Sequence, residues 1–252
     1  MIKIHNLDFT HNNQKLFDNL DLTIKKGEFV FISGPTSNGK TTLLKLLAGL
    51  ITSDKIETDI SQKEIGFVFE NPENYFVADK VSDEITFMLE NLNYSKKDQL
   101  EKLNEIAKLF NIENLLELNP HSLSGGEKEL VALAAALVIK PKLLLIDGTL
   151  SMLDGVTKDK VMKTLKKMNK EMTIICTTNN LEDSLYGKRL ILIDKKIVLD
   201  KKITEAFNDE LIFKKCHLEM PFMASLSHKL KYYGLTDKVI LNMNTMVDTL
   251  WK

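Results

Sequence analysis

The segment at residues 34–41 (GPTSNGKT) has a composition and spacing that bind phosphate groups. It matches G-x-x-x-x-G-K-[ST], follows an apolar run and opens a helical stretch. Small residues let successive backbone N–H groups turn toward a phosphate, and the helix N-terminus adds about half a positive charge. The Lys40 amine suits the β- and γ-phosphates, and the Thr41 hydroxyl suits Mg²⁺. We expect nucleotide contacts from Gly34, Pro35, Thr36, Ser37, Asn38, Gly39, Lys40, Thr41 and Thr42.

A carboxylate follows a second apolar run. Residues 142–147 read KLLLID, so the predicted strand ends on Asp147. Ligands of open α/β sheets bind beyond the carboxyl ends of the strands. The position therefore predicts that Asp147 binds the metal together with Thr41.

A third motif, LSGGE, begins at Leu123. Ser124 and Glu127 have the spacing of a capping box ahead of an apolar, helical run. Gly125 and Gly126 leave the helix N-terminus uncovered, so that backbone amides can approach an anion. An ordinary capped helix is the alternative, but two consecutive glycines disfavour a helix start. We expect this segment to contact a phosphate.

Strands and helices alternate around these motifs. Continuous apolar runs predict strands at 28–33, 63–70, 143–147, 172–177 and 189–194. This alternation predicts an α/β fold with a parallel sheet. Together with the phosphate-binding loop, it resembles the RecA-like sheet of P-loop NTPases. Residues 2–4 and 20–24 predict a small antiparallel β unit at the N-terminus. A helical pattern predicts an inserted α-helical subdomain at about 72–140, and the tail at 206–252 has no obvious strand.

Composition excludes several other classes of protein. The chain has 252 residues and a net charge of −1, so no basic field attracts nucleic acid. Its longest apolar run, at 130–139, is too short for the roughly 18–20 residues that span a bilayer. The two cysteines are isolated, which excludes a disulfide framework and indicates a reducing cytosol. Arg189 is the single arginine, so an anion site must use lysine, backbone amides and helix ends.

The three motifs, in this order, resemble the ATP-binding cassette (ABC) ATPases over about residues 1–205. The resemblance implies a head-to-tail dimer. In it, each ATP lies between the P-loop of one subunit and the LSGGE segment of the other, near Asp154. Residues 68–74, 79–92 and the tail segments 218–222 and 225–235 are also similar to the ATPases of energy-coupling factor vitamin transporters, which are relatives of the cobalt and nickel importer ATPases.

The sequence departs from the family at the positions that handle water. Gly148 follows Asp147, where the family has the glutamate that polarises the attacking water. Asn179 stands for the switch histidine and cannot titrate. Glu70 stands for a glutamine that binds metal and water. We expect Glu70 to bind the metal rather than act as the base, because added negative charge near the γ-phosphate repels.

Two further departures concern nucleotide binding. His11 stands where the family has an aromatic residue that stacks on adenine. Two interpretations of His11 are open: its smaller imidazole ring stacks on adenine, or it is an exposed loop residue. Ser37 stands where the P-loop usually has glycine, and a positive φ there would strain the loop.

These features predict a subunit that binds Mg·ATP but hydrolyses it poorly, since a positioned base contributes roughly 10²- to 10⁴-fold. The intact LSGGE segment predicts a heterodimer with a different, competent ABC ATPase. The resemblance also implies integral membrane partners at the cytoplasmic face of the membrane. Phe69, Tyr75 and Phe76 either line the groove for those partners or pack inside the helical subdomain. A regulatory or assembly module that binds nucleotide without hydrolysis is the alternative function.

Overall fold

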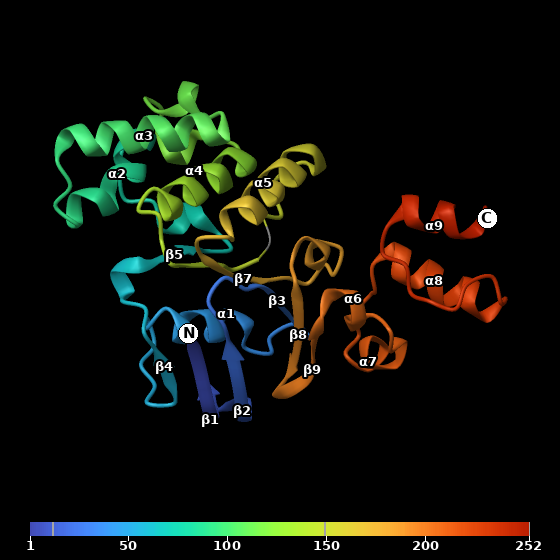
Figure 1. The fold of residues 1–252 in the computed structure, drawn as a ribbon. Coiled ribbons are helices and arrows are strands. Elements are labelled where there is room, and N and C mark those ends of the chain that lie inside the picture. Colours follow the sequence, from blue (N-terminus) through green and yellow to red (C-terminus); the bar gives the residue numbers. More distant parts are fainter. Residues whose placement is uncertain (12, 149, 252) are drawn as a thin grey trace.

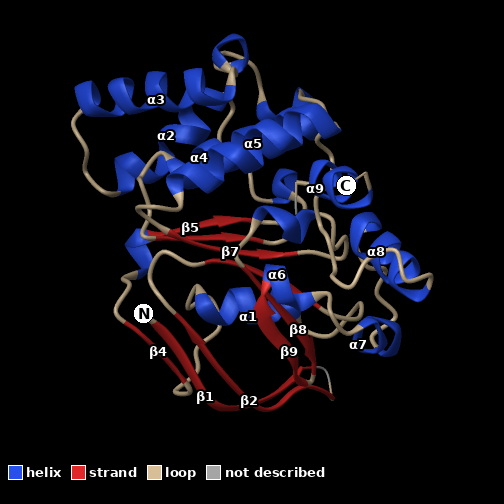
Figure 2. Cartoon of the chain, turned by 45° about the vertical axis from the view of Figure 1, so that its right-hand side comes forward, coloured by secondary structure: helices blue, strands red, loops and turns tan. Residues whose placement is uncertain are grey.

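Two β-sheets with a helix between them form the base of the fold. The computed structural model describes residues 1–11, 13–148 and 150–251. In Figures 1 and 2, α1 (Lys40–Leu47) lies between the small N-terminal sheet and the large sheet. Its apolar face, including Leu43 and Leu47, is buried in a core shared with both sheets. The phosphate-binding loop that precedes α1 is therefore held by packing on two sides.

The large sheet confirms the predicted α/β fold. Its strand order is β5-β6-β7-β3-β8-β9, with every pair parallel except β8 and β9. The bounds are β3 Phe29–Ser33, β5 Ile65–Val68, β6 Leu143–Ile146, β7 Thr173–Thr177, β8 Arg189–Asp194 and β9 Lys196–Lys202. Every residue of β3, β6 and β7 is buried. This burial agrees with their continuous apolar sequences, which are typical of central parallel strands covered on both faces.

The N-terminal sheet is antiparallel, as predicted, but its strands are longer than the alternating pattern indicated. Strands β1 (Ile2–His11), β2 (Gln14–Ile24) and β4 (Ile56–Thr58) pair in the order β2-β1-β4. Asn6 and Asn19 have positive φ, and the β1–β2 register shifts between Ile4 and Thr10. Such bulges interrupt the period of two without ending the ladder, which explains why only the strand ends are visible in the sequence.

Helices α2 (Val81–Asn91), α3 (Lys96–Phe110) and α4 (Gly125–Leu137) form the green group at the top of Figure 1, with α5 (Gly155–Met168) beside them. Helix α6 (Ile203–Ala206) leads into the tail, which contains α7 (Glu210–Lys215), α8 (Phe222–Tyr232) and α9 (Met243–Leu250). Short 3₁₀ helices cover Gln62–Glu64, Pro72–Asn74, Glu113–Leu115, Pro120–Ser122 and Asp183–Tyr186. Helix α5 begins at Gly155 because the side chain of Asp154 caps the backbone N–H groups of Val156 and Thr157.

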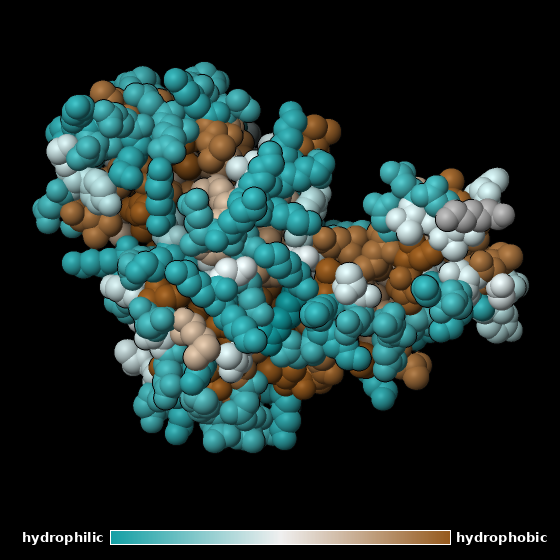
Figure 3. Space-filling view, viewed as in Figure 1, coloured by the Kyte–Doolittle hydropathy of each residue, from teal (hydrophilic) through white to brown (hydrophobic). Residues whose placement is uncertain are grey.

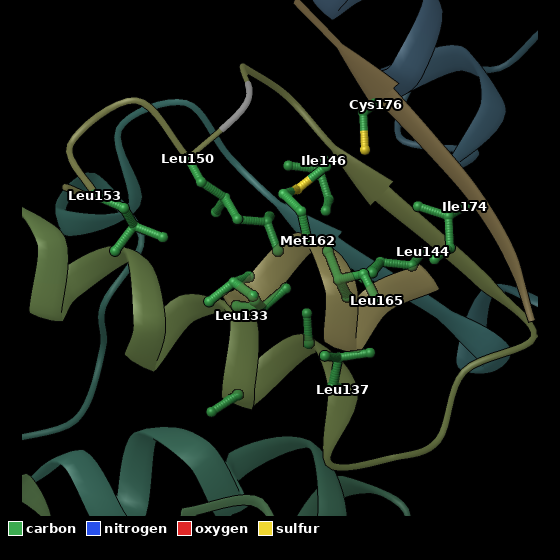
Figure 4. Packing of buried hydrophobic residues seen from close by; sticks show 14 of the residues in the cluster. Leu133, Leu137, Leu144, Ile146, Leu150, Leu153, Met162, Leu165, Ile174 and Cys176 are labelled. Carbon is green, nitrogen blue, oxygen red and sulfur yellow. The ribbon is translucent and has the colours of Figure 1, made fainter. Parts of the chain in front are cut away.

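The main core joins α4 and α5 to one face of the large sheet. Figure 4 shows Leu133 and Leu137 of α4 and Leu165 of α5 in one buried cluster with Ile146 of β6 and Cys176 of β7. All five side chains are buried. This packing fixes the carboxyl ends of β6 and β7, where the candidate site residues begin.

The tail lies at the side of the molecule. Figure 1 shows α8 and α9 away from the sheets, and Figure 3 shows hydrophobic side chains between them and the body. Met223, Ile240 and Met246 form a small separate core there.

Candidate functional site

A cleft of about 410 Å³ opens beyond the carboxyl ends of β3, β6 and β7. Residues 36–42 of the loop and α1 line it. Predicted site residues from four other segments line the same cleft: His11, Glu70, Asp147, Gly148 and Asn179. The fold thus brings together residues that are up to 168 positions apart in the chain, as between His11 and Asn179.

The loop conformation explains two of its glycines and one departure. Gly34 has a φ of 152°, and a Cβ there would lie 2.1 Å from the Ile193 carbonyl oxygen. Gly39 has a φ of 83°, and a Cβ there would lie 3.0 Å from the Phe17 ring. Ser37 has a φ of 64°, in the left-handed region that costs an L-residue about 1–2 kcal/mol. Serine thus occupies a backbone conformation that suits glycine better.

The Lys40 side chain is held by hydrogen bonds to the backbone of the loop. Its amine donates to the carbonyl oxygens of Gly34 and Pro35, each at 2.9 Å. Gly34 and Pro35, which were predicted to contact nucleotide, are not among the described residues that line the cleft. Burial lowers the pKa of Lys40, while the charges of Asp147 and Glu70 oppose that shift. A bound anion would favour the charged amine in the same way.

Asp147 lies at the end of β6 with only 4% of its surface exposed. Its Oδ1 accepts a hydrogen bond from the Thr177 hydroxyl at 2.8 Å. No group of three or more His, Cys, Asp or Glu side chains is arranged for a metal among the residues the structure describes. Mg²⁺ commonly uses one or two carboxylates plus substrate phosphates, and Asp147 with the Thr41 hydroxyl in the same cleft fits that pattern.

The Glu70 side chain lies in the space that a side chain at position 148 would enter. Gly148 has a φ of 70°, and a Cβ at this position would lie 3.2 Å from Glu70 Cγ. Its backbone N–H donates to the Thr177 hydroxyl at 2.7 Å. The turn after Asp147 therefore has a glycine conformation, and the Glu70 side chain lies over it.

Asn179 is exposed at the rim of the cleft. The preceding Thr178 hydroxyl bonds to both the N–H and the carbonyl oxygen of Asn180, each at 2.9 Å. On the far side of this loop, Lys158 of α5 forms an ion pair with the buried Asp183 at 2.7 Å. The loop that presents Asn179 is thus held by its neighbours.

The LSGGE segment lies outside the lining of this cleft. Ser124 and Glu127 form the predicted capping box, with the Ser124 N–H bonded to Glu127 Oε2 at 2.9 Å. Gly125 and Gly126 contact the turn before α5, where a Cβ at 125 would lie 2.6 Å from Met152 Sδ. The buried Glu129 accepts the Met152 N–H at 3.1 Å.

Together these contacts make the start of α4 and the turn ending at Asp154 one connected unit. Leu123 is buried beneath it, whereas Ser124 and Asp154 are exposed. Two residues predicted for a shared phosphate site are therefore accessible to a partner.

A second, mostly apolar groove of about 610 Å³ lies between the sheet and α2. Phe69, Tyr75 and Phe76 line it. The rings of Phe69 and Tyr75 stack with centroids 3.8 Å apart. The two readings of these aromatics are compatible, because the rings pack on each other and also face the groove.

Sequence reasoning missed Gln14, Leu16, Thr177 and Thr178 in the cleft lining. Gln14 and Leu16 belong to β2, which reaches the cleft only because the N-terminal sheet packs over α1. The two threonines directly precede Asn179. Their place at the end of an apolar strand is the one signal that marks them.

Comparisons with known proteins agree with this geometry. The ABC transporter family model matches residues 17–151. The energy-coupling factor transporter ATP-binding protein EcfA1 of Oenococcus oeni is 32% identical over 98% of this chain and 95% of its own. The protein of that name from Clostridioides difficile is 34% identical over 98% of this chain and 97% of its own.

Solved structures show the same similarity. CbiO1 of Clostridium perfringens, described as part of the ABC transporter complex CbiONQ, has a TM-score of 0.74 and 26% identity, covering 90% of this chain and 98% of its own. The ATP-binding cassette MJ0796, a dimer bound to ADP and phosphate, has a TM-score of 0.72 and 25% identity, covering 81% of this chain and 99% of its own.

Proposed function

The chain belongs to the ABC transporter family, among the ATP-binding subunits of energy-coupling factor transporters, and we propose that it binds Mg·ATP in its P-loop cleft but hydrolyses it poorly there. We assign the cassette to residues 1–205 and a separate tail to residues 206–252. The observation that carries the proposal is Gly148, which follows the predicted metal ligand Asp147 without a side chain.

The binding half of the site is complete in this chain. The P-loop amides and Lys40 would hold the phosphates, and Thr41, Asp147 and Glu70 would hold Mg²⁺. The metal would neutralise phosphate charge when bound. His11 lies at the rim of the cleft on β1, where its ring can stack on adenine.

The hydrolytic half is altered. No carboxylate follows Asp147, and Asn179 cannot exchange a proton as a histidine can. Glu70 lies over Gly148, but a carboxylate bound to the metal is a poor base. Loss of a positioned base alone removes roughly 10²- to 10⁴-fold of rate. We therefore expect this site to hold ATP for long periods.

The partner in turnover would be a second, different ABC ATPase. Ser124, Gly125, Gly126 and Glu127 are intact and form a capped helix start. The chain can therefore contribute this segment and Asp154 to a composite site whose P-loop and glutamate come from the partner. A homodimer would have two sites without the base.

Membrane subunits are the further partners that we propose. The apolar groove beside α2 has the size and lining to accept a short helix, with Tyr75 47% exposed at its edge. Over the described residues, no helix combines the length and apolarity needed to cross a membrane. We place the subunit at the cytoplasmic face, peripheral to the membrane.

Affinity purification from native membranes, followed by ATPase assay, tests the proposal. We expect a second ABC ATPase and integral membrane proteins to copurify, and turnover to depend on the second ATPase. A homodimer with normal turnover would contradict the heterodimer and the impaired site. Recovery of the chain without any membrane protein would favour the regulatory or assembly module instead.

A further inference from the structure

We propose that Thr177 is a positioning residue that orients the Asp147 carboxylate toward the Mg²⁺ of bound nucleotide. The inference rests on the proposed Mg·ATP binding and names a residue that acts through Asp147. Thr177 lies at the end of β7, is 2% exposed, and bonds to two groups of the neighbouring strand end.

The strand register brings these groups together. Strands β6 and β7 are parallel neighbours, and Ile146 pairs with Cys176. One residue further along each strand, Asp147 and Thr177 come side by side at the edge of the cleft. Register partners point to the same face of a sheet, so the two side chains meet.

The single hydroxyl proton determines the direction of both bonds. The Gly148 N–H can only donate, so the Thr177 oxygen accepts that bond at 2.7 Å. Its own proton is then directed at Asp147 Oδ1, 2.8 Å away. This donated hydrogen bond restrains the orientation of the Asp147 carboxylate at the edge of the cleft, where Mg²⁺ would be bound.

The glycine at 148 makes this restraint important. Gly148 has a φ of 70° and, as a glycine, contributes no side chain that could hold Asp147 in place. The Thr177 hydroxyl bonds the turn and the carboxylate at the same time. Groups that orient metal ligands in this way typically affect metal affinity by about 10- to 100-fold.

The test titrates Mg²⁺ into each variant with a fluorescent ATP analogue and records the concentration that gives half of the metal-dependent gain in binding. We expect Thr177→Val to raise this concentration by about tenfold or more. Affinity for the analogue in EDTA should remain within about twofold, since the phosphate loop is untouched. Thr177→Ser, which keeps the hydroxyl, should remain within about threefold of the parent.

Thr173→Val is the matched control. Thr173 is a buried threonine at the opposite end of β7, and its hydroxyl accepts the Gly27 N–H at 3.0 Å. Thr173→Val loses a backbone-to-hydroxyl hydrogen bond far from the cleft. The Mg²⁺ dependence of this variant should therefore equal that of the parent. An unchanged Mg²⁺ dependence in Thr177→Val, or an equal shift in Thr173→Val, would overturn the inference.

Two further readouts keep the outcomes separate. If Thr177→Val does not fold, Thr177→Ser and Thr177→Ala repeat the comparison, because they differ by one oxygen atom; equal Mg²⁺ dependence of that pair would also overturn the inference. If the parent protein binds no ATP with Mg²⁺ present, the proposed function itself fails.

Discussion

At the scale of single residues, the position after Asp147 is a glycine, Gly148, in the turn that follows β6. Gly148 has a left-handed backbone, and Glu70 from the segment after β5 lies over it. Each residue is therefore adapted to the other. A carboxylate at 148 would meet both an unfavourable φ and an occupied space.

Alanine substitution separates these two costs. Gly148→Ala should lower the free energy of unfolding by about 1 kcal/mol from its φ, and by more because the new Cβ contacts Glu70. Gly234 has a φ of 71° with no atom within 4 Å of its Cβ position, so Gly234→Ala measures the φ cost alone.

Denaturant unfolding measures both variants. In a Glu70→Ala background, the cost of Gly148→Ala should fall to the Gly234→Ala value. Equal costs of the two alanine variants in the parent background would show that the Glu70 contact is unimportant.

Restoring the family's glutamate should not restore turnover by itself. We expect Gly148→Glu to leave the ATPase rate of the purified complex nearly unchanged, because Glu70 and Asn179 remain. Adding Glu70→Gln and Asn179→His should raise it. ATPase rate is measured as phosphate release. A large increase in this rate from Gly148→Glu alone would contradict the expectation that all three positions must change together.

At the scale of elements, the start of α4 has two separate roles. The capping box of Ser124 and Glu127 stabilises the helix, and we propose that the exposed Ser124 side chain also faces the nucleotide of a partner ATPase. The Ser124–Glu127 bonds hold the pKa of Glu127 below its usual value. Stability and partner function can therefore be tested with different substitutions.

Ser124→Ala should lower the free energy of unfolding by about 1 kcal/mol through loss of the cap. Ser124→Arg should abolish ATP turnover of the complex, because its bulk would lie against the partner's γ-phosphate. ATP binding to the isolated chain should be unchanged in both, since Ser124 is absent from the described lining of the chain's own cleft. Normal turnover of the Ser124→Arg complex would refute the composite site.

At the scale of the whole molecule, the tail is attached beside the loop that carries Asn179. Glu182 Oε1 accepts the backbone N–H of Phe222, the first residue of α8, at 2.5 Å. The His228 ring bonds to the Phe207 carbonyl oxygen at 2.8 Å. The dipole of α8 also favours the Glu182 carboxylate at the N-terminus of this helix.

Removing this cap should loosen the tail without unfolding the cassette. Glu182→Ala should increase the rate of limited proteolysis within residues 206–252 by roughly fivefold, which corresponds to about 1 kcal/mol for one hydrogen bond. Glu219→Ala is the control, because this exposed carboxylate and Glu182 both line a separate hollow beside α8. Equal cleavage rates for the two variants would contradict a role for the Glu182 contact.

The accuracy of the sequence predictions depended on how local each signal was. The sequence predicted the capping box at Ser124 and the strand ending at Asp147, because each signal consists of a few adjacent residues. The middle of β1 was missed because bulges break its alternation. Helices α7, α8 and α9 of the tail were not predicted, and Met223 and Met246 acquire a common core only in the folded chain.

The sequence by itself determined the family, the phosphate loop and the absence of a carboxylate after Asp147, because these depend on residue types at fixed short spacing. Only the tertiary structure decided that Thr177 bonds to Asp147 and that Glu70 lies over Gly148. The physical reason is the strand order β5-β6-β7-β3-β8-β9, which makes neighbours of strand ends far apart in the chain. That order follows from packing of the whole sheet, which no local pattern records.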